Sequence, residues 1–326
     1  MNPLTLATLR LLGDGEYRSG ESIAAALGVT RATVWNSVHE AEALGLAIES
    51  VRGRGYRLVA PPIWLDARAI EQRLGAHAPR FRIELVEQVA STNSVLLERD
   101  PTAAPSGSVL VAEMQSGGRG RRGRTWSSAL GGALTFSLLW RFEQGAAGLT
   151  GLSLVVGVAV ARALSGLGAA DIQLKWPNDI LWHGRKLGGI LIEVQGDALG
   201  PATAVIGIGI NVRVPPALRA SIDQPVADAA EAGAGTDRNR LLAAVLTELA
   251  AMLDAFSREG FGPLEPEFRR RHALQDAEVV ANLGDGAPVR GRALGTADDG
   301  SLLVETSDGL RRFHGGEVSL RAAGAA

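Results

Sequence analysis

The chain has 326 residues, 46% of them hydrophobic and 21% charged, a composition typical of a soluble globular protein with two or three domains. It contains no cysteine, which excludes disulfides, thiol nucleophiles and thiolate metal sites. The net charge of −2 gives no global signal for nucleic acid, so any DNA binding must come from a local surface.

The amino-terminal residues are a poor match to a signal peptide, because no basic start precedes the short apolar run. The longest uncharged run, residues 146–161, is rich in small residues and is typical of a buried core helix. We therefore expect a cytoplasmic protein that does not insert into a membrane.

Residues 1–62 predict a winged helix-turn-helix domain. The apolar pattern from Leu4 to Leu12 marks a first helix, and Ser19 and Thr30 are suitable N-caps for two more. Gly45 can end the third helix. Strand-like residues then flank the glycine-rich tip RGRG, which predicts a β wing, and Pro61 and Pro62 follow as a stiff linker.

Charge alone does not predict DNA binding by this domain, because its six arginines are matched by six acidic residues. The geometry of the domain does predict it, since the third helix would enter the major groove while the wing approaches phosphate. The alternative is that the domain only regulates or stabilises the rest of the chain. The predicted DNA-binding residues are Arg31, Thr33, Asn36 and Ser37 on the third helix, and Arg52 and Arg54 on the wing.

Residues 66–271 alternate strand-like and helix-like segments and predict an α+β domain. The residues from 272 to 326 contain short strand-like segments separated by glycine and aspartate, which predict a small β-barrel. His183 and Gly184 can form a tight turn between two strands. In the central domain, strands are expected near residues 81–85, 109–114, 134–140, 172–176, 180–182, 187–194 and 204–211, helices over 151–167 and 240–256, and a loop over 212–235.

The stretch GGRGRRGR, residues 117–124, has the GxGxxG spacing of dinucleotide-binding loops. Four arginines crowd it, no helix follows it, and we expect no β-α-β unit around it, so we reject a dinucleotide fold. Arginines interleaved with glycines are instead suited to a mobile loop that closes on a polyanion. The alternative is a solvated basic loop without a ligand.

The chain uses arginine as its default cation, with 31 arginines and only two lysines. Both lysines lie in motifs close to each other in sequence, Lys175 in KWPND and Lys186 in RKLGGIL. This choice suggests sites that need a compact ammonium rather than a planar guanidinium, although chance can also explain it.

Four motifs occur in the order STN (residues 91–93), GRGRRGR, KWPND and RKLGGIL, and together they resemble the biotin–protein ligase family. The resemblance also covers the winged helix and a carboxy-terminal domain ending in GGEVSLR. It therefore spans essentially the whole chain and matches the bifunctional ligase–repressor form. It implies a central domain with the class II synthetase or biotin–lipoate ligase fold and an SH3-like carboxy-terminal barrel.

By this resemblance, the chain would use ATP and Mg²⁺ to convert biotin into biotinyl-5′-AMP. It would then transfer biotin to a lysine of the biotin carboxyl carrier protein of acetyl-CoA carboxylase. The resemblance further implies an adenylate-promoted homodimer that represses biotin synthesis genes at operator DNA. The alternative is a ligase whose winged helix does not repress. A pure biotin-sensing regulator would not need the arginine loop and lysines, and a lipoate ligase fits the loop and winged helix less well.

The resemblance assigns catalysis to Lys186 and Arg121, with Lys186 bridging the biotin carboxylate and the α-phosphate. It assigns Mg²⁺ to Asp179. Trp126 would stack on adenine, form a lid or pack as core, and Gly207 and Gly209 would let ligand approach the backbone. The implied biotin contacts are Ser91, Thr92, Asn93, Gln115, Gly118, Arg119, Gly120, Arg121 and Lys186; the implied ATP contacts are Arg121, Arg122, Arg124, Trp126, Lys175, Asn178, Asp179, Lys186, Asn211 and Arg321.

Two stretches depart from the family pattern. Many relatives have an asparagine and a tyrosine in the strand where this chain reads GGALTFS, residues 131–137, which puts a side-chain role there in doubt. The loop over 212–235 fits no family pattern, so its contact with adenosine is only a hypothesis.

Overall fold

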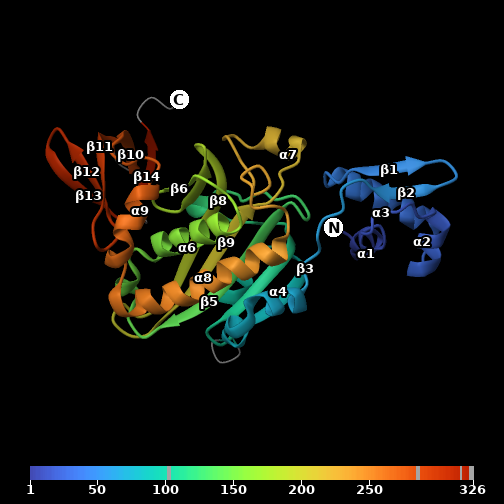
Figure 1. Ribbon diagram of the computed structural model, residues 1–326, viewed down its shortest axis with the longest axis horizontal. Coiled ribbons are helices and arrows are strands. Elements are labelled where there is room, and N and C mark those ends of the chain that lie inside the picture. The colour runs from blue at the N-terminus through green and yellow to red at the C-terminus, as the bar shows by residue number, and fades with distance from the viewer. Residues whose placement is uncertain (101–103, 284–286, 316–317, 323–326) are drawn as a thin grey trace.

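The computed structural model describes residues 1–100, 104–283, 287–315 and 318–322, in three units along the chain (Figure 1). A small helical unit with a β ribbon precedes a central seven-stranded sheet, and a five-stranded sheet follows it. Gly316 and Glu317 of the predicted GGEVSLR motif lie outside the described residues. The mixed α+β architecture predicted from sequence is confirmed.

The amino-terminal unit is the predicted winged helix-turn-helix. Ser19 Oγ accepts a hydrogen bond from Ser22 N at 3.0 Å, and Thr30 Oγ1 accepts one from Thr33 N at 3.2 Å, so both predicted N-caps form. Gly45 adopts φ 88° just after the third helix, as a helix terminator does. The elements are α1 (Pro3–Leu11), α2 (Gly20–Leu27), α3 (Arg31–Ala43), β1 (Ile48–Val51) and β2 (Gly55–Leu58).

The prediction that Ser37 lies on the exposed face of the third helix is wrong. Ser37 is only 4% exposed, because it shares the inner face of the helix with Val34, Val38 and Ala41. These positions follow the i, i+3, i+4, i+7 spacing that turns toward a core. Ser37 therefore packs in the core of the domain and does not lie on the exposed face of α3.

The central sheet has the order β3-β4-β5-β9-β8-β7-β6, with β3 and β4 parallel and the other neighbouring strands antiparallel. The predicted strands and the two long predicted helices are present. The structure also contains four helices that the sequence analysis did not predict, α4, α5, α7 and α9. The strands are β3 (Arg82–Val89), β4 (Ser108–Gln115), β5 (Ala133–Phe142), β6 (Ile172–Lys175), β7 (Asp179–Trp182), β8 (Arg185–Gly196) and β9 (Ala202–Asn211); the helices are α4 (Ala67–Leu74), α5 (Thr92–Leu97), α6 (Leu152–Gly166), α7 (Pro216–Ser221), α8 (Arg238–Glu259) and α9 (Glu265–Arg271).

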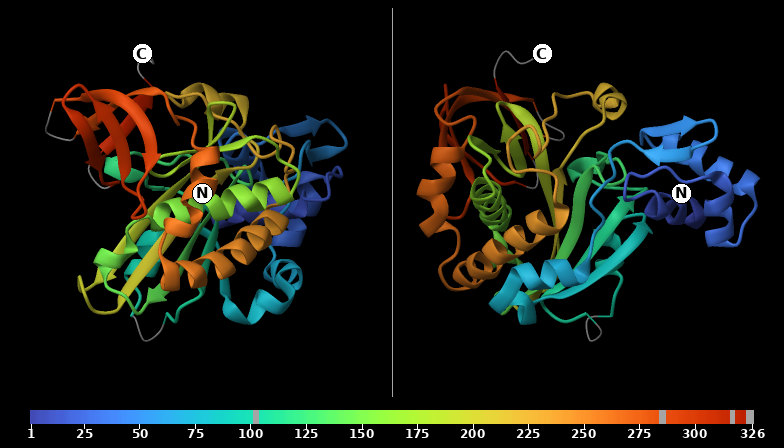
Figure 2. Two further views of the ribbon diagram at one scale, coloured as in Figure 1. Left: turned by 60° about the vertical axis from the view of Figure 1, so that its left-hand side comes forward. Right: turned by 45° about the vertical axis from the view of Figure 1, so that its right-hand side comes forward.

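Helices α6 and α8 cover one face of this sheet (Figure 2). Alternate residues of β9, such as Ile206 and Ile208, pack into the core under these helices, while Gly207 and Gly209 lie on the opposite face. Helix α5 packs on that opposite face through Leu96. The strand alternation thus leaves the second face available for a site beside α5.

One helical run, Ala146–Gly166, is long and apolar enough to cross a membrane. It comprises a short 3₁₀ turn and α6, and 67% of its most apolar 18-residue segment is buried. Its apolar side chains belong to the main core cluster, together with those of the sheet and α8. The run is therefore a core helix, as the sequence predicts.

Among the described residues, no β-α-β unit encloses the arginine loop, as the sequence predicts. Strand β3, helix α5 and the parallel strand β4 form such a unit, and β4 ends just before the loop. The loop itself lies outside the unit, because it runs through a 3₁₀ turn at Arg121–Gly123 into the antiparallel strand β5. It is therefore still not a dinucleotide-binding loop.

The predicted tight turn between β7 and β8 is confirmed, since His183 and Gly184 both have positive φ, 46° and 71°. The predicted loop after β9 contains the short helix α7, flanked by irregular chain. Its segment around Val226 pairs with the backbone of Lys186, the residue to which the sequence assigns catalysis.

The carboxy-terminal unit is an antiparallel sheet with the order β13-β12-β11-β10-β14. Its apolar residues belong to the same core cluster as those of the central domain, and Trp176 Nε1 donates to Gly300 O at 3.0 Å across the boundary. This shared core holds Arg321 of β14 against the central domain. The strands are β10 (Glu278–Leu283), β11 (Val289–Thr296), β12 (Leu302–Thr306), β13 (Gly309–Phe313) and β14 (Val318–Ala322).

Candidate active site

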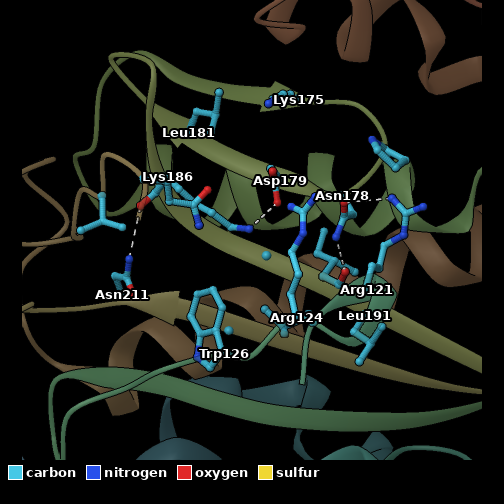
Figure 3. Close-up of a pocket in the computed structure, with 18 of the residues that line it drawn as sticks. Arg121, Arg124, Trp126, Lys175, Asn178, Asp179, Leu181, Lys186, Leu191 and Asn211 are labelled. Atoms are coloured by element: carbon cyan, nitrogen blue, oxygen red, sulfur yellow. Dashed lines mark hydrogen bonds and ion pairs between the residues drawn. The ribbon is translucent and has the colours of Figure 1, made fainter. Parts of the chain in front are cut away.

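A cavity of about 1810 Å³ lies on the sheet face opposite α6 and α8, and it gathers the sequence motifs (Figure 3). Its walls come from the start of α5, the arginine loop, the turn between β6 and β7, strands β8 and β9, and β14. Of the predicted biotin and ATP contacts, all except Gly118 line this cavity. Gly118 is buried beneath the loop, where a Cβ would lie 2.5 Å from the backbone oxygen of Trp126, so only glycine fits there.

One end of the cavity is built from neutral hydrogen-bonding groups. The Gln115 carbonyl accepts hydrogen bonds from Thr92 N at 2.7 Å and from Thr92 Oγ1 at 3.1 Å. The Thr92 and Ser137 hydroxyls lie 2.7 Å apart, and Ser137 Oγ donates to Asn93 Oδ1 at 2.5 Å. Ser91 is the N-cap of α5. These groups are held in fixed positions before any ligand binds.

Sequence reasoning missed two members of this network. Ser137 is fully buried in β5, so a side-chain role in the GGALTFS stretch exists after all, as a link between Thr92 and Asn93. Glu193 of β8 accepts from Asn93 Nδ2 at 2.8 Å and from Arg119 Nη2 at 2.9 Å. One feature of the sequence could have predicted the role of Ser137: Thr135 and Ser137 place two hydroxyls at alternate positions of an otherwise apolar strand.

Two arginines of the loop, Arg119 and Arg121, bind neighbouring elements through identified hydrogen bonds. Arg119 pairs with Glu193, while Arg121 Nη1 donates to Asn178 Oδ1 at 3.2 Å and Arg121 Nη2 to the carbonyl of Gly315. Burial, with the nearby Arg122 as a smaller cause, lowers the pKa of Arg121 below its usual value. Arg122 and Arg124 are exposed at the cavity mouth.

Both lysines of the chain point into the cavity region around Asp179. Lys186 Nζ lies 2.7 Å from Asp179 Oδ1, and both side chains are mostly buried. Burial lowers the pKa of Lys175, and the nearby carboxylate of Asp179 partly offsets this effect. Lys186, Arg321 and Arg124, in decreasing order of effect, lower the pKa of Lys175 further. This end of the cavity therefore concentrates positive charge around one carboxylate and suits a polyanion.

The KWPND motif has a structural as well as an electrostatic role. Asn178 Nδ2 donates to Ile190 O at 2.8 Å, so the side chain joins the β6–β7 turn to β8 while its oxygen receives Arg121. Trp176 is 2% exposed and anchors the carboxy-terminal domain. The motif thus holds the arginine loop and the carboxy-terminal domain in one place.

The segment after β9 docks on the backbone of Lys186. Lys186 N donates to Pro225 O at 2.8 Å, and Ala227 N donates to Lys186 O at 2.9 Å. The Asn211 amide donates to the carbonyls of Lys186 and Ala227, at 3.3 and 3.0 Å. Asn211 therefore fixes this docking, and the residues just before Val226 form part of the cavity wall.

Gly207 and Gly209 of β9 line the cavity and also make room for two neighbouring side chains. A Cβ on Gly209 would lie 2.6 Å from Trp126 Cε2, and a Cβ on Gly207 would lie 2.3 Å from Asn93 Oδ1. Trp126 is half-buried over Gly209 and faces the same space as Lys186 (Figure 3). Its ring face thus forms part of the wall at the cationic end.

Within the described part of the chain, no group of three His, Asp or Glu side chains could hold a metal ion by itself. Asp179 is the carboxylate nearest to both lysines at the cationic end. Magnesium commonly uses one or two carboxylates together with substrate phosphates and water, so a single carboxylate is compatible with that ion.

Neutral hydrogen-bonding groups at one end and a cluster of arginine and lysine at the other define a ligase site for a polar small molecule and a nucleotide. The family profiles that match the chain are "Biotin/lipoate A/B protein ligase family" over residues 85–211, "HTH domain" over 5–57, and "Biotin protein ligase C terminal domain" over 277–321.

Curated relatives match essentially the whole chain. The "Bifunctional ligase/repressor BirA" of Salmonella typhimurium is 38% identical, covering 98% of both chains, and that of Escherichia coli is 36% identical, covering 99% of this chain and 98% of its own. A biotin protein ligase from Aquifex aeolicus, solved with biotin and ATP, matches with a TM-score of 0.64 and 31% identity over 74% of this chain and 99% of its own. The chain belongs to the biotin protein ligase family, in the form with an amino-terminal helix-turn-helix domain, and the resemblance drawn from the motifs is confirmed.

Proposed function

We propose that the chain activates biotin with ATP and transfers it to a carrier-protein lysine, and that its winged helix represses biotin synthesis genes. The observation that carries the enzymatic part is the position of Lys186. Its ammonium lies at the cationic end of the cavity and is held by Asp179 at 2.7 Å.

The hydrogen-bonding end suits the fused urea ring of biotin, which has both donors and acceptors. The Gln115 carbonyl is already used by Thr92, so the amino group of Gln115 is available to the ureido oxygen. The hydroxyls of Ser91 and Thr92 complete the set, and Asn93 and Ser137 hold Thr92 in place. A lipoyl group has no urea ring, so this end favours biotin.

In the first step, a carboxylate oxygen of biotin attacks the α-phosphorus of ATP. A new O–P bond forms, the bond to the β-phosphate oxygen breaks, and pyrophosphate leaves. Two anions must approach each other, so fixed cations are needed between them. Lys186 would bridge the carboxylate and the α-phosphate, and Arg119, Arg121, Arg122 and Arg124 would close over both. Lys175 and Arg321, which line the same cavity, would neutralise charge on the departing phosphates.

In the second step, the neutral amine of a carrier lysine attacks the acyl carbon of biotinyl-5′-AMP. An amide bond forms, the acyl–oxygen bond breaks and AMP leaves with the electron pair. Only about one lysine amine in two thousand is neutral at pH 7, so an activated acyl donor is needed. The carrier we propose is the biotin carboxyl carrier protein of acetyl-CoA carboxylase.

Asp179 would hold Mg²⁺ when the nucleotide is bound. The ion would supply charge neutralisation for the phosphates. In the ligand-free protein the same carboxylate orients Lys186, so nucleotide binding would exchange one cationic partner of Asp179 for another.

The repressor part is supported by the exposed residues of the winged helix. Arg31 and Asn36 lie on the outer face of α3, and Arg52 and Arg54 are exposed at the wing. Arg54 stacks at 4.0 Å on Tyr17, which presents it from a rigid ribbon. We propose that a cytoplasmic homodimer, formed when the adenylate is bound, contacts paired half-sites of operator DNA. The competing reading is a ligase without repression.

The test combines two assays on the full-length protein. Biotinylation of purified carrier protein is measured with biotin or lipoate and MgATP, and binding to DNA upstream of biotin synthesis genes is measured with and without those ligands at fixed salt. We expect biotin-specific transfer and tighter, cooperative DNA binding with biotin and MgATP. Transfer of lipoate instead would overturn the substrate assignment. Intact biotinylation without specific DNA binding would leave the ligase alone.

A further inference from the structure

Helix α3 carries two neighbouring rings, tilted by 35° to each other, that the predicted DNA-binding set does not contain. The Trp35 side chain is 51% exposed, and its ring centroid lies 3.7 Å from that of His39. His39 Nδ1 donates to the backbone oxygen of Trp35 at 2.9 Å, which fixes the imidazole against the indole. In the neutral imidazole this bond leaves Nε2 as a hydrogen-bond acceptor.

The pair occupies the centre of the outer face of α3. At about 100° per residue, the exposed positions span an arc of about 140°. Arg31 and Asn36 lie at the two edges of this arc, and Trp35 and His39 lie between them. Arg31 is also paired with Glu21 at 3.3 Å. The side chains best placed to enter a groove head-on are therefore the two rings.

Folding of the domain does not require the Trp35 ring. The core of the winged helix is formed by buried side chains from all three helices and the wing, among them Leu9, Ile23 and Val38. A half-exposed indole adds little to that core, yet it is a large apolar group with one N–H donor, a type of side chain enriched at binding surfaces.

We propose that the Trp35–His39 pair reads thymine by packing against its 5-methyl group in the major groove. The inference rests on the proposed DNA-binding function and names the base class that α3 recognises. Thymine is the base that presents a methyl group in the major groove, and an apolar ring gains from covering it. Arg31 at the edge of the arc then suits a phosphate contact and Asn36 an adenine edge.

The experiment begins with selection of duplexes from a randomised library by the wild-type protein with biotin and MgATP at fixed salt. In the selected duplex each thymine is then replaced in turn by uracil, which removes only the methyl group. We expect one or more positions in each half-site to lose about fourfold in affinity per methyl. Trp35→Ala should bind the unmodified duplex roughly ten- to hundredfold more weakly and should no longer distinguish thymine from uracil.

Two variants control this result. Trp35→Phe keeps an apolar ring and should retain the thymine preference. Val59→Ala removes another exposed apolar side chain, 55% exposed at the end of the wing, and should change neither affinity nor preference. Equal carrier biotinylation shows that the ligase domain folds in all variants, and unchanged thermal unfolding of the winged helix shows that this domain, with its own core, folds as well. The dependence of affinity on salt should stay the same, because phosphate contacts are untouched.

The outcomes separate the two proposals. If the wild type selects a sequence but Trp35→Ala keeps the same affinity and the same response to uracil, reading by the ring pair is wrong and the repressor proposal stands. If the wild type biotinylates its carrier but selects no sequence, the repressor proposal fails, and this inference fails with it.

Discussion

Lys186 Nζ and Asp179 Oδ1 lie 2.7 Å apart on neighbouring strands β8 and β7, and the pair is mostly shielded from solvent. The pair places the ammonium inside the cavity before any substrate arrives. The backbone of the same lysine is held by Pro225 and Ala227, so both the chain and the side chain are fixed. Such pre-organisation favours stabilisation of a charge that develops during reaction.

Replacement of Lys186 by alanine should reduce biotin-dependent ATP–pyrophosphate exchange by about a hundredfold or more, because the cation between the two reacting anions is lost. Lys186→Arg should restore only part of the activity, since a planar guanidinium does not replace a compact ammonium. An unchanged circular dichroism spectrum and unfolding midpoint would show that the variant folds. Retained exchange in Lys186→Ala would place the reacting carboxylate elsewhere.

Replacement of Asp179 by asparagine should raise the Mg²⁺ concentration needed for half-maximal adenylate formation, because a neutral amide is a weaker ligand than a carboxylate. The matched control is Asp223→Asn, an exposed residue on the wall of the same cavity. The measurement is a Mg²⁺ titration at saturating ATP for both variants. Equal Mg²⁺ dependence in both would exclude Asp179 as the metal ligand.

Replacement of Ser137 by alanine should raise the KM for biotin roughly three- to tenfold, the loss expected for one or two hydrogen bonds, with little change in kcat. The reason is that Ser137 links Thr92 and Asn93. Thr135→Val serves as the control, because its buried hydroxyl donates to the backbone oxygen of Ala112 and not to the biotin network. Similar KM values for both variants would contradict the assignment.

The buried pair Arg238–Glu113 should matter for stability rather than catalysis. The two side chains are 0% and 3% exposed, and Arg238 also donates to Ile63 O at 2.9 Å, which ties the linker to the ligase domain. Arg238→Ala leaves a buried carboxylate without its partner and should lower the free energy of unfolding by about 3–5 kcal/mol. Urea unfolding measures this loss. Adding Glu113→Gln to Arg238→Ala should recover part of the lost free energy of unfolding. If the double variant loses the sum of the two single losses, the two side chains do not stabilise each other.

His272 should make stability depend on pH below neutrality. Burial lowers the pKa of this histidine from 6.5 to about 4, and its ring packs on Phe268. The unfolded chain therefore takes up a proton near pH 6.5 while the folded protein does not, so this histidine does not lower the free energy of unfolding above that pH. As the pH falls from 6.5 toward about 4, the free energy of unfolding decreases by at most about 3 kcal/mol.

The check compares unfolding free energies of the wild type and His272→Leu at pH 7 and pH 5. Leucine cannot be protonated, so the variant should become more stable relative to the wild type as the pH is lowered. A difference that stays the same at both pH values would show that His272 does not contribute to the pH dependence.

The sequence by itself determined the local features of this protein. Ser19 and Thr30 cap their helices, Gly45 terminates one, and His183 with Gly184 turns a hairpin, because each of these depends on a few neighbouring residues. The motifs likewise identified most of the cavity, since each motif lies on one strand end or one loop.

Only the tertiary structure decided which side chains meet across the sheet. Ser137 and Glu193 enter the site through strand register, Gly207 and Gly209 make room for Asn93 and Trp126, and the segment near Val226 docks on Lys186. Ser37 turned inward because the packing of α3 on its neighbours, not its polarity, set the buried face. These contacts join residues far apart in sequence, so the packing of the whole chain fixes them and no local pattern encodes them.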